Sequence, residues 1–478
     1  MKAVVIGGGL AGITAAIALA QAKMDVTLLE AKPRLGGATM SFSRDDLVVD
    51  TGQHVFLRCC TAYRGLLDRL GMSAHAPIQP RFDVTVVTPA GAARMRRGRL
   101  PAPLHLAPAL LRYNLLSFPE RSKVSQAALA FRRVNPADPK ADEIRVGDWL
   151  AAHGQDERTR RALWDLFTVS TLNVPGDDGS LALAAKVVRT GLLGDSGSAD
   201  IGVPALSLGE LHGAAAGRLL AKLGATVRPN TKVAEILPQA AGGFTVTTVR
   251  SGESLAADVV VLAVPHEAAA KLIPAEALPA ATVAGWSGLG AAPIVNVHAI
   301  YDRKVMDLPF AAGVDSPVQW VFDRTRISGM HARGDNGQYL AISLSAADEY
   351  VDKSVAELRE QFVPALADLF PAARDAKLTE FFVTRERRAT FRQVPGCVRL
   401  RPGPATRLPG LALAGSWTDT GWPDTMESAV RSGLAAVVAI REDLEAAGKS
   451  PASTGTNRDL AGIVDDSVTD VNEVEVRL

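Results

Sequence analysis

The first thirty residues alternate between unbroken apolar runs and a stretch of small residues, a pattern typical of parallel α/β folds. Ala3 to Ile6 contains no polar residue, which predicts a strand buried on both faces. The alanine-rich stretch that follows favours a helix, and Asp25 to Leu29 predicts a second buried strand. Together these elements predict a βαβ unit at the start of the chain.

Between the first strand and the helix, Gly7, Gly9 and Gly12 have the spacing G-x-G-x-x-G. The first glycine allows a tight turn, the second lets the backbone approach a diphosphate, and the third lets the helix pack on the strand. Glu30 follows the second strand, 18 residues after Gly12, where a carboxylate accepts hydrogen bonds from ribose hydroxyls. The unit therefore predicts a dinucleotide site, and the acidic residue favours FAD or NAD over NADP.

Strand-like runs return later in the chain and indicate that the nucleotide domain is discontinuous. "GATVRPNTKVAEI", residues 244–250 and "ADVVVLAVP" are predicted strands. Leu411 to Ala414 predicts another short strand, followed by a glycine-rich loop and a long helix that begins near Thr425. The predicted fold class is α/β, a Rossmann-like FAD-binding domain with an interleaved α+β substrate domain. We assign the FAD-binding domain to residues 1–80, 201–265 and 401–445, and the substrate and membrane-facing domain to residues 81–200 and 266–400.

Composition narrows the class of protein without pointing to a charged partner. The chain of 478 residues exceeds one ordinary core, its apolar content of 47% is that of a globular protein, and its net charge is +1. Cys59, Cys60 and Cys397 have no metal-ligand spacing, so we expect no metal, and they fit a reducing cytosol. The sequence contains no apolar run long enough for a spanning helix. Residues 446–478 are polar and acidic, which predicts a disordered tail.

Residues 81–133 differ in composition from the rest of the chain. They hold ten basic residues against two acidic ones, interleaved with leucines in "PAPLHLAPALLRYNLLSF". Apolar side chains enter the acyl boundary of a bilayer while cations meet headgroups, so the segment predicts docking on an anionic membrane surface through Arg94, Arg96, Arg97 and Arg99. We expect no nucleic acid partner, because few aromatic residues are available for stacking. The alternative is that the leucines are core and the arginines a solvated face.

The nucleotide domain is built from separate segments of the chain, and the last of them contains "GSWTDTGWPDTMESAVRSG". In both features the chain resembles the FAD-dependent amine oxidase and carotenoid desaturase superfamily. Thr425 stands where amine oxidases carry an aromatic residue that helps to cage the amine, and Lys304 lies in a polar, surface-like context, so an amine substrate is disfavoured. "DTGQHVF", the proline-rich apolar block and "SWTDTGWP" are most similar to the hydroxysqualene dehydroxylases of hopanoid biosynthesis. One departure is Ser416, because the family usually has an acidic residue there, and Asp419 is a candidate for that role.

The resemblance implies non-covalent FAD and a set of residues that contact it. The helix at "TMESAV" would place its N-terminus against the flavin, where the helix dipole stabilises negative charge on the reduced ring. A covalent link is not expected, because no cysteine or histidine directly precedes this helix. The predicted cofactor-binding residues are Gly7, Gly8, Gly9, Leu10, Ala11, Gly12, Glu30, Ala31, Arg34, Gly36, Gly37, Ala38, Thr39, Gly52, Gln53, His54, Val233, Gly415, Ser416, Asp419, Thr425, Met426 and Ala429.

By the same resemblance, the substrate is an isoprenoid lipid, hydroxysqualene, which reduced FAD would convert to squalene with loss of water. This step requires an acid that turns the hydroxyl into a leaving water, and a dry tunnel that protects an allylic cation from bulk water. We favour His54 as the acid because it follows backbone that is expected to run beside the ring. Asp50, Tyr63 and Asp424 are the alternatives, and Asp50 is expected mainly to fix the loop after its strand.

Two other functions use the same motifs. A carotenoid-type desaturase would run in the opposite redox direction and oxidise a C–C bond of an isoprenoid. A non-catalytic prenyl-lipid carrier would keep the fold without flavin, and the complete "GGGLAG", Glu30 and "MESAV" elements argue against it. The sequence leaves the electron donor, the redox direction and the oligomeric state open. We expect a cytoplasmic protein that associates peripherally with the membrane.

Overall fold

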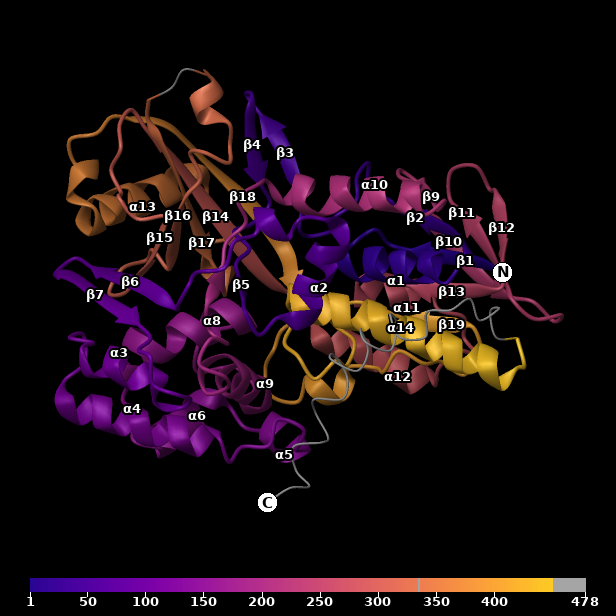
Figure 1. The fold of residues 1–478 in the computed structure, drawn as a ribbon, viewed down its shortest axis with the longest axis horizontal. Coiled ribbons are helices and arrows are strands. Elements are labelled where there is room, and N and C mark those ends of the chain that lie inside the picture. The colour runs from indigo at the N-terminus through magenta and orange to yellow at the C-terminus, as the bar shows by residue number, and fades with distance from the viewer. Residues whose placement is uncertain (334–335, 450–478) are drawn as a thin grey trace.

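A five-stranded parallel sheet, built from separated parts of the chain, forms the first layer of the structure (Figure 1). The computed structural model describes residues 1–333 and 336–449, so the tail predicted at 446–478 lies outside the described residues beyond residue 449. The order of the strands is β19-β13-β1-β2-β9, which confirms the predicted α/β class. Their bounds are β1 (Lys2–Ile6), β2 (Asp25–Leu29), β9 (Thr226–Arg228), β13 (Val259–Leu262) and β19 (Leu411–Leu413).

Two helices pack side by side against this sheet, α1 (Leu10–Gln21) and α14 (Met426–Ala446) (Figure 1). Every residue of α1 except its last is buried, because the helix lies between the sheet and α14. Small residues make this close packing feasible: a Cβ at Gly433 of α14 would lie only 2.3 Å from the carbonyl oxygen of Ala11. The alanine-rich sequence of α1 is therefore explained by burial on all sides.

A three-stranded antiparallel sheet follows β9 and lies at the same end of the molecule (Figure 1). It contains β10 (Val233–Pro238), β11 (Phe244–Thr248) and β12 (Ser254–Ala257). The stretch "GATVRPNTKVAEI", predicted as one strand, forms two strands in different sheets, because residues 229–232 turn the chain between them.

A seven-stranded sheet forms the second layer, and the buried face of α13 (Val355–Leu369) packs against it. Its order is β18-β14-β17-β16-β15-β6-β7, and all neighbours are antiparallel except the pair β15 and β6. The last two strands come from the basic segment 81–133. The bounds are β6 (Asp83–Thr88), β7 (Gly91–Arg96), β14 (Ala292–Tyr301), β15 (Phe310–Gly313), β16 (Trp320–Asp323), β17 (Gln338–Leu344) and β18 (Leu378–Thr390).

The region between β7 and β8 is mainly helical and lies below the seven-stranded sheet in Figure 1. Its helices are α3 (Ala107–Leu111), α4 (Phe118–Phe131), α5 (Pro139–Asp142), α6 (Val146–Ala152), α7 (Glu157–Thr159), α8 (Asp165–Leu172) and α9 (Leu181–Val187). Within residues 1–333 and 336–449, no helix combines the length and the apolar character needed to cross a bilayer. The remaining strands and α-helices are β3 (Ser41–Arg44), β4 (Leu47–Asp50), β5 (Phe56–Leu57), β8 (Ile201–Gly202), α2 (Thr61–Leu70), α10 (Ala215–Lys222), α11 (His266–Leu272) and α12 (Ala280–Gly285).

Candidate active site

The turn between β1 and α1 is built from glycines whose missing side chains leave room for backbone. A Cβ at Gly7 would lie 2.2 Å from the carbonyl oxygen of Ala263, and a Cβ at Gly12 would lie 1.9 Å from the carbonyl oxygen of Gly7. Gly7 also has a φ of 109°, which glycine adopts without strain. At Gly9, by contrast, the one atom within 4 Å of a Cβ is Cα of Gly37 at 3.9 Å, so a ligand can approach this backbone closely.

The first turn of α1 offers hydrogen-bond donors to an anion. Its N-cap residue, Gly9, provides no side-chain cap, so N–H groups such as those of Leu10 and Ala11 remain available at the positive end of the helix dipole. Gly8 donates its N–H to the carboxylate of Glu30 at 2.6 Å. The residue expected to bind ribose thus lies directly beside the turn expected to bind diphosphate.

Residues 34–39 pack backbone to backbone against the same turn. The N–H of Gly36 donates to a carbonyl of the turn at 2.8 Å, and a Cβ at Gly37 would lie 2.9 Å from Cα of Gly9. The hydroxyl of Thr39 closes the segment by donating to the carbonyl of Gly36 at 2.9 Å. The structure therefore brings the two glycine-rich segments together at the carboxyl ends of β1 and β2, where nucleotides bind in open α/β sheets.

The other predicted residues of this region lie around these two segments. Arg34 donates to a backbone carbonyl of β3, and Ala38 accepts a hydrogen bond from the hydroxyl of Thr51 at 2.7 Å. The latter contact joins the glycine-rich segments to the loop after β4. Ala31 is exposed beyond β2, and Val233 is buried at the start of β10 in the neighbouring sheet.

Asp50, at the end of β4, is held by several partners at once. Its carboxylate accepts hydrogen bonds from the hydroxyl of Ser41 at 2.5 Å and from the N–H of Leu208 at 2.9 Å. It also forms an ion pair with Arg324, and both side chains are buried. These contacts tie the loop after β4 to β3, to Leu208 and to Arg324, the structural role expected for Asp50.

His54 lies in the same loop, half-buried, and its Nδ1 atom is buried without a partner among the described residues. Burial lowers the pKa of His54 below its ordinary value of 6.5. Gly52 packs under the ring, since a Cβ there would lie 3.0 Å from the imidazole Cε1. The Oε1 atom of Gln53 and the Oδ1 atom of Asn296 are also buried without a described partner, while the Nδ2 of Asn296 donates to the carbonyl of Thr51 at 3.2 Å. Buried polar atoms are normally paired, so these three atoms indicate where polar groups of a ligand would lie.

The C-terminal part of the site begins directly after β19. Gly415 has a φ of 141° and donates its N–H to a serine of α14 at 2.9 Å. Thr425 is the N-cap of α14, and its hydroxyl accepts the N–H of Ser428 at 3.4 Å. Met426 and Ala429, on the first turn of α14, pack against the core that contains α1. The start of α14 is thus fixed close to the glycine turn.

Asp419, the residue expected to supply the acidic contact in this loop, is exposed, and its carboxylate accepts the N–H of Gly421 at 3.1 Å. It stabilises a local turn. The structure adds a residue that the sequence did not suggest, Arg401, whose side chain is only 6% exposed. Arg401 donates to the carbonyls of Ser416 at 3.1 Å and Thr418 at 2.6 Å, and so fixes the backbone of the loop.

Other buried groups around the site also escaped sequence reasoning. Glu427 is 1% exposed and accepts the N–H groups of Ala62 at 3.1 Å and Tyr63 at 2.8 Å, which joins α2 to the start of α14. The hydroxyl of Tyr63 lies 2.8 Å from Nε2 of His212, and burial raises the pKa of this tyrosine. Glu427 belongs to the "MESAV" motif, so its burial was open to prediction. Arg324 and His212 come from distant segments and carry no local signal.

These features fit FAD. The glycine turn and the first turn of α1 would hold the diphosphate, and Glu30 would accept hydroxyls of the adenosine ribose. The unpaired atoms of Gln53 and Asn296 would meet the ring system. The capped start of α14 provides a helix N-terminus beside the same site.

Comparison with known proteins gives the same assignment. The family described as flavin containing amine oxidoreductase matches residues 10–441, so the chain belongs to this family and is an FAD-dependent oxidoreductase. A hydroxysqualene dehydroxylase of Rhodopseudomonas palustris is 30% identical over 446 residues, which cover 90% of this chain and 96% of that protein. A 15-cis-phytoene desaturase of Narcissus pseudonarcissus is 26% identical over 476 residues, covering 93% of this chain and 80% of that protein.

Among solved structures, the cyclohexylamine oxidase of Brevibacterium oxydans has a TM-score of 0.67 with 20% sequence identity, and covers 93% of this chain and 99% of that chain. The predicted fold class, superfamily and cofactor are therefore confirmed. The predicted surface position of Lys304 is also confirmed, since its ammonium group is exposed and pairs with Asp307 at 2.8 Å.

Proposed function

We propose that this oxidoreductase acts on an isoprenoid lipid and reduces hydroxysqualene to squalene, with release of water. The observation that carries the proposal is the similarity to hydroxysqualene dehydroxylases along nearly the whole chain, at 30% identity. The similarity to phytoene desaturases, at 26%, supports the same class of substrate and makes desaturation the second candidate. A prenyl-lipid carrier without flavin is disfavoured by the intact FAD site.

The chemistry of the proposed reaction places clear demands on the protein. Hydroxide is a poor leaving group, so the hydroxyl must receive a proton as the C–O bond breaks. When bound, reduced FAD supplies the hydride that replaces the hydroxyl at the allylic carbon. The protein must position the acid and exclude bulk water from the developing cation.

Among the four acids considered, we favour His54 for its position. The carboxylate of Asp424 is engaged by the N–H of Phe391 at 2.9 Å. Asp50 is engaged by Arg324, and the hydroxyl of Tyr63 is engaged by His212 on a fully buried side chain. His54 retains an unpaired nitrogen next to the loop backbone that would meet the ring. We assign the proton donor to His54 on this geometry.

Two separate reactions, one with each candidate substrate, test the proposal. Purified holoenzyme, reduced without oxygen, would be incubated with hydroxysqualene, and oxidised holoenzyme with phytoene and an artificial electron acceptor. Squalene in the first reaction and unchanged phytoene in the second are the expected results. Desaturated phytoene and unchanged hydroxysqualene would instead establish the desaturase.

We further propose that an apolar patch on residues 100–129 docks on an anionic membrane to collect this water-insoluble substrate. Of twelve large apolar side chains exposed among the described residues, five belong to this patch. Leu106, Leu110 and Leu115 are partly buried and Leu116 is buried, so these four leucines serve the core instead. The patch consists of Leu100, Leu104, Leu111, Phe118 and Leu129, which are between 47% and 70% exposed.

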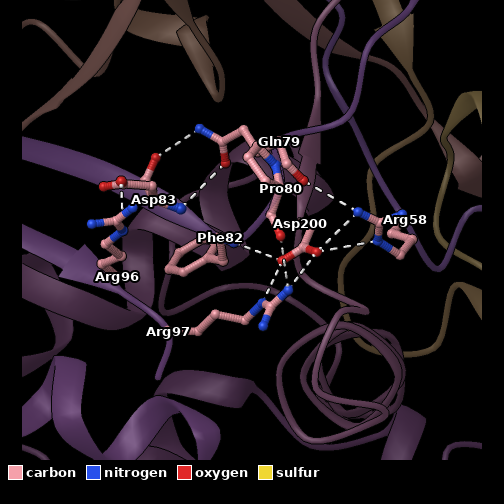
Figure 2. Close-up of polar contacts among 8 residues, drawn as sticks. All are labelled: Arg58, Gln79, Pro80, Phe82, Asp83, Arg96, Arg97 and Asp200. Carbon is pink, nitrogen blue, oxygen red and sulfur yellow. Dashed lines mark hydrogen bonds and ion pairs between the residues drawn. The ribbon is translucent and has the colours of Figure 1, made fainter. Parts of the chain in front are cut away.

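Three of the four arginines expected to meet lipid headgroups have carboxylate partners within the protein. Arg97 donates to the buried carboxylate of Asp200 at 2.6 and 2.9 Å, and Arg58 approaches the same carboxylate at 3.1 Å (Figure 2). Arg94 and Arg96 both pair with Asp83, at 2.6 and 3.2 Å. Each of these two carboxylates is shared by two arginines, so the positive charge is only partly neutralised, and Arg94 and Arg96 remain exposed. We therefore propose that basic residues without such a partner make the main contacts with headgroups. Among the described residues, the exposed basic residues of this segment for which no ion pair is found are Arg99, Arg112, Lys123, Arg132 and Arg133.

A further inference from the structure

The loop between β19 and α14 contains two aspartates, which differ sharply in their surroundings. Asp419 is exposed and its carboxylate is used by the turn at Gly421. Asp424 is half-buried and directly precedes Thr425, the N-cap of α14. Its backbone N–H donates to the side-chain oxygen of Gln393 at 2.9 Å, so the backbone position of Asp424 is fixed.

The carboxylate of Asp424 is tied to both sides of the site. It accepts the N–H of Phe391, the residue after β18, at 2.9 Å. Burial raises the pKa of Asp424, and the neighbouring side chain of Ser416 opposes this shift by stabilising the ionised form. Ser416 itself has no carboxylate. Asp424, at the other end of the loop, therefore supplies an acidic group next to Ser416.

Arg401 adds a donor at the same place. Although this side chain is only 6% exposed, its Nη1 atom has no acceptor among the described residues, whereas Nη2 donates to the carbonyls of Ser416 and Thr418. The guanidinium also stacks over the ring of Phe391, with 5.2 Å between Cζ and the ring centre. A buried guanidinium N–H without a partner is costly, which indicates that a bound group accepts from it.

We propose that Asp424, next to Ser416, and Arg401 bind the ribityl and diphosphate portion of FAD. The carboxylate of Asp424 accepts hydrogen bonds from sugar-type hydroxyls, and Arg401 donates to an anionic or carbonyl oxygen. Asp424 is thus the acidic contact of the C-terminal cofactor loop, in place of Asp419.

Titration of apoprotein with FAD, followed by quenching of flavin fluorescence, tests this assignment without any substrate. Asp424→Ala should raise the Kd for FAD at least tenfold, since a hydrogen bond to a charged group is lost. The double variant Ser416→Asp/Asp424→Ala should return the Kd to within about threefold of the wild type, because it moves the carboxylate to the other end of the same pair. Asp368→Ala, an exposed position on α13, is the matched control and should bind FAD as the wild type does.

Several outcomes would overturn the proposal. Unchanged FAD affinity in Asp424→Ala, or a loss in Asp419→Ala alone, would remove Asp424 from the site. Failure of the double variant to regain affinity would reduce Asp424 to a structural tie between Phe391 and the loop. If Asp424→Ala does not fold, as judged by thermal melting, Asp424→Asn keeps the shape of the side chain. This variant should fold and bind FAD more weakly, and FAD affinity equal to the wild type would overturn the assignment.

Discussion

His54 is the residue on which the proposed chemistry depends most. Its pKa lies below 6.5 because burial disfavours the imidazolium, so the protonated fraction is small at neutral pH and grows as the pH falls. Turnover limited by this acid should therefore rise on acidification toward that pKa and fall as the pH rises through it.

A pH profile of kcat with the His54→Gln variant checks this role. The variant should retain FAD, lose this pH dependence and lose about 100-fold in turnover, the usual effect of removing a positioned acid. Wild-type turnover with an unchanged profile would return the role to another group or to water.

His298 and His212 should make the fold sensitive to acid. Both are fully buried, and burial lowers the pKa of each to about 3, against 6.5 for an ordinary histidine. Because the unfolded chain binds the protons, stability is fully present above pH 6.5 and is lost as the pH falls from there toward 3. Between pH 7.5 and 5.5 each histidine should cost about 1.4 kcal/mol of unfolding free energy.

Urea unfolding of the wild type and of His298→Gln at these two pH values measures the effect. Glutamine is chosen because His298 contacts the hydroxyls of Tyr339 at 2.8 Å and Thr384 at 3.1 Å, which an amide also binds. The variant should lose less stability on acidification than the wild type by about 1.4 kcal/mol. An equal loss in both proteins would show that His298 is not a source of the acid sensitivity.

At the residue scale, the predictable part of the site is the part dictated by local backbone. Gly7 and Gly12 were identified from spacing alone, because a strand, a tight turn and a helix in sequence leave no room for a Cβ. Arg401, Asn296 and Arg324 were not identified, because their contacts arise only when distant strands and loops meet.

At the scale of elements, the contact between α1 and α14 determines how the C-terminal helix reaches the site. Gly433→Ala would place a Cβ 2.3 Å from the carbonyl oxygen of Ala11, which is backbone and cannot move aside cheaply. This overpacking should cost about 1–3 kcal/mol and weaken FAD retention by displacing the start of α14. Thermal melting and FAD titration provide the readouts.

Gly217→Ala on α10 is the matched control, because nothing lies within 4 Å of the added Cβ. In this half-buried helical position alanine should stabilise the protein by about 0.5–1 kcal/mol. A Gly433→Ala protein as stable as the Gly217→Ala protein would contradict the packing account.

The apolar patch on residues 100–129 and the basic residues near it predict binding to anionic membranes. Co-sedimentation with anionic vesicles at low salt should weaken at least tenfold when Arg99, Arg112, Arg132 and Arg133 are replaced by serine, since each cation near the surface contributes about 1 kcal/mol. This set leaves the pair between Arg97 and Asp200 intact. The control replaces four exposed arginines elsewhere, Arg250, Arg359, Arg399 and Arg407.

Equal sedimentation of both quadruple variants would remove the patch from the membrane account. The two sets remove the same charge from the protein, so a general effect of net charge would weaken both proteins alike. Binding that does not decline with added salt would also contradict an electrostatic role for these arginines.

For the whole molecule, the parallel sheet was predictable and the seven-stranded sheet was not. The parallel strands are apolar runs with clear stops, and one motif ties β1, α1 and β2 together. In the second sheet, β6 pairs with β15, a strand more than 200 residues away, and alternation within a strand does not reveal its partner. A second long-range pairing, between β5 and β8, brings Asp200 beside Arg58, and it also has no local signal in the sequence (Figure 2).

The most direct test of the proposed reaction is a single turnover without oxygen in heavy water. Holoenzyme whose FAD has been reduced chemically would receive one equivalent of hydroxysqualene. The expected result is return of oxidised-flavin absorbance together with one squalene per flavin, one mass unit heavier because the hydride donated by reduced flavin exchanges with solvent before transfer. Flavin that remains reduced while hydroxysqualene is unchanged, or squalene without the label, would contradict the proposal.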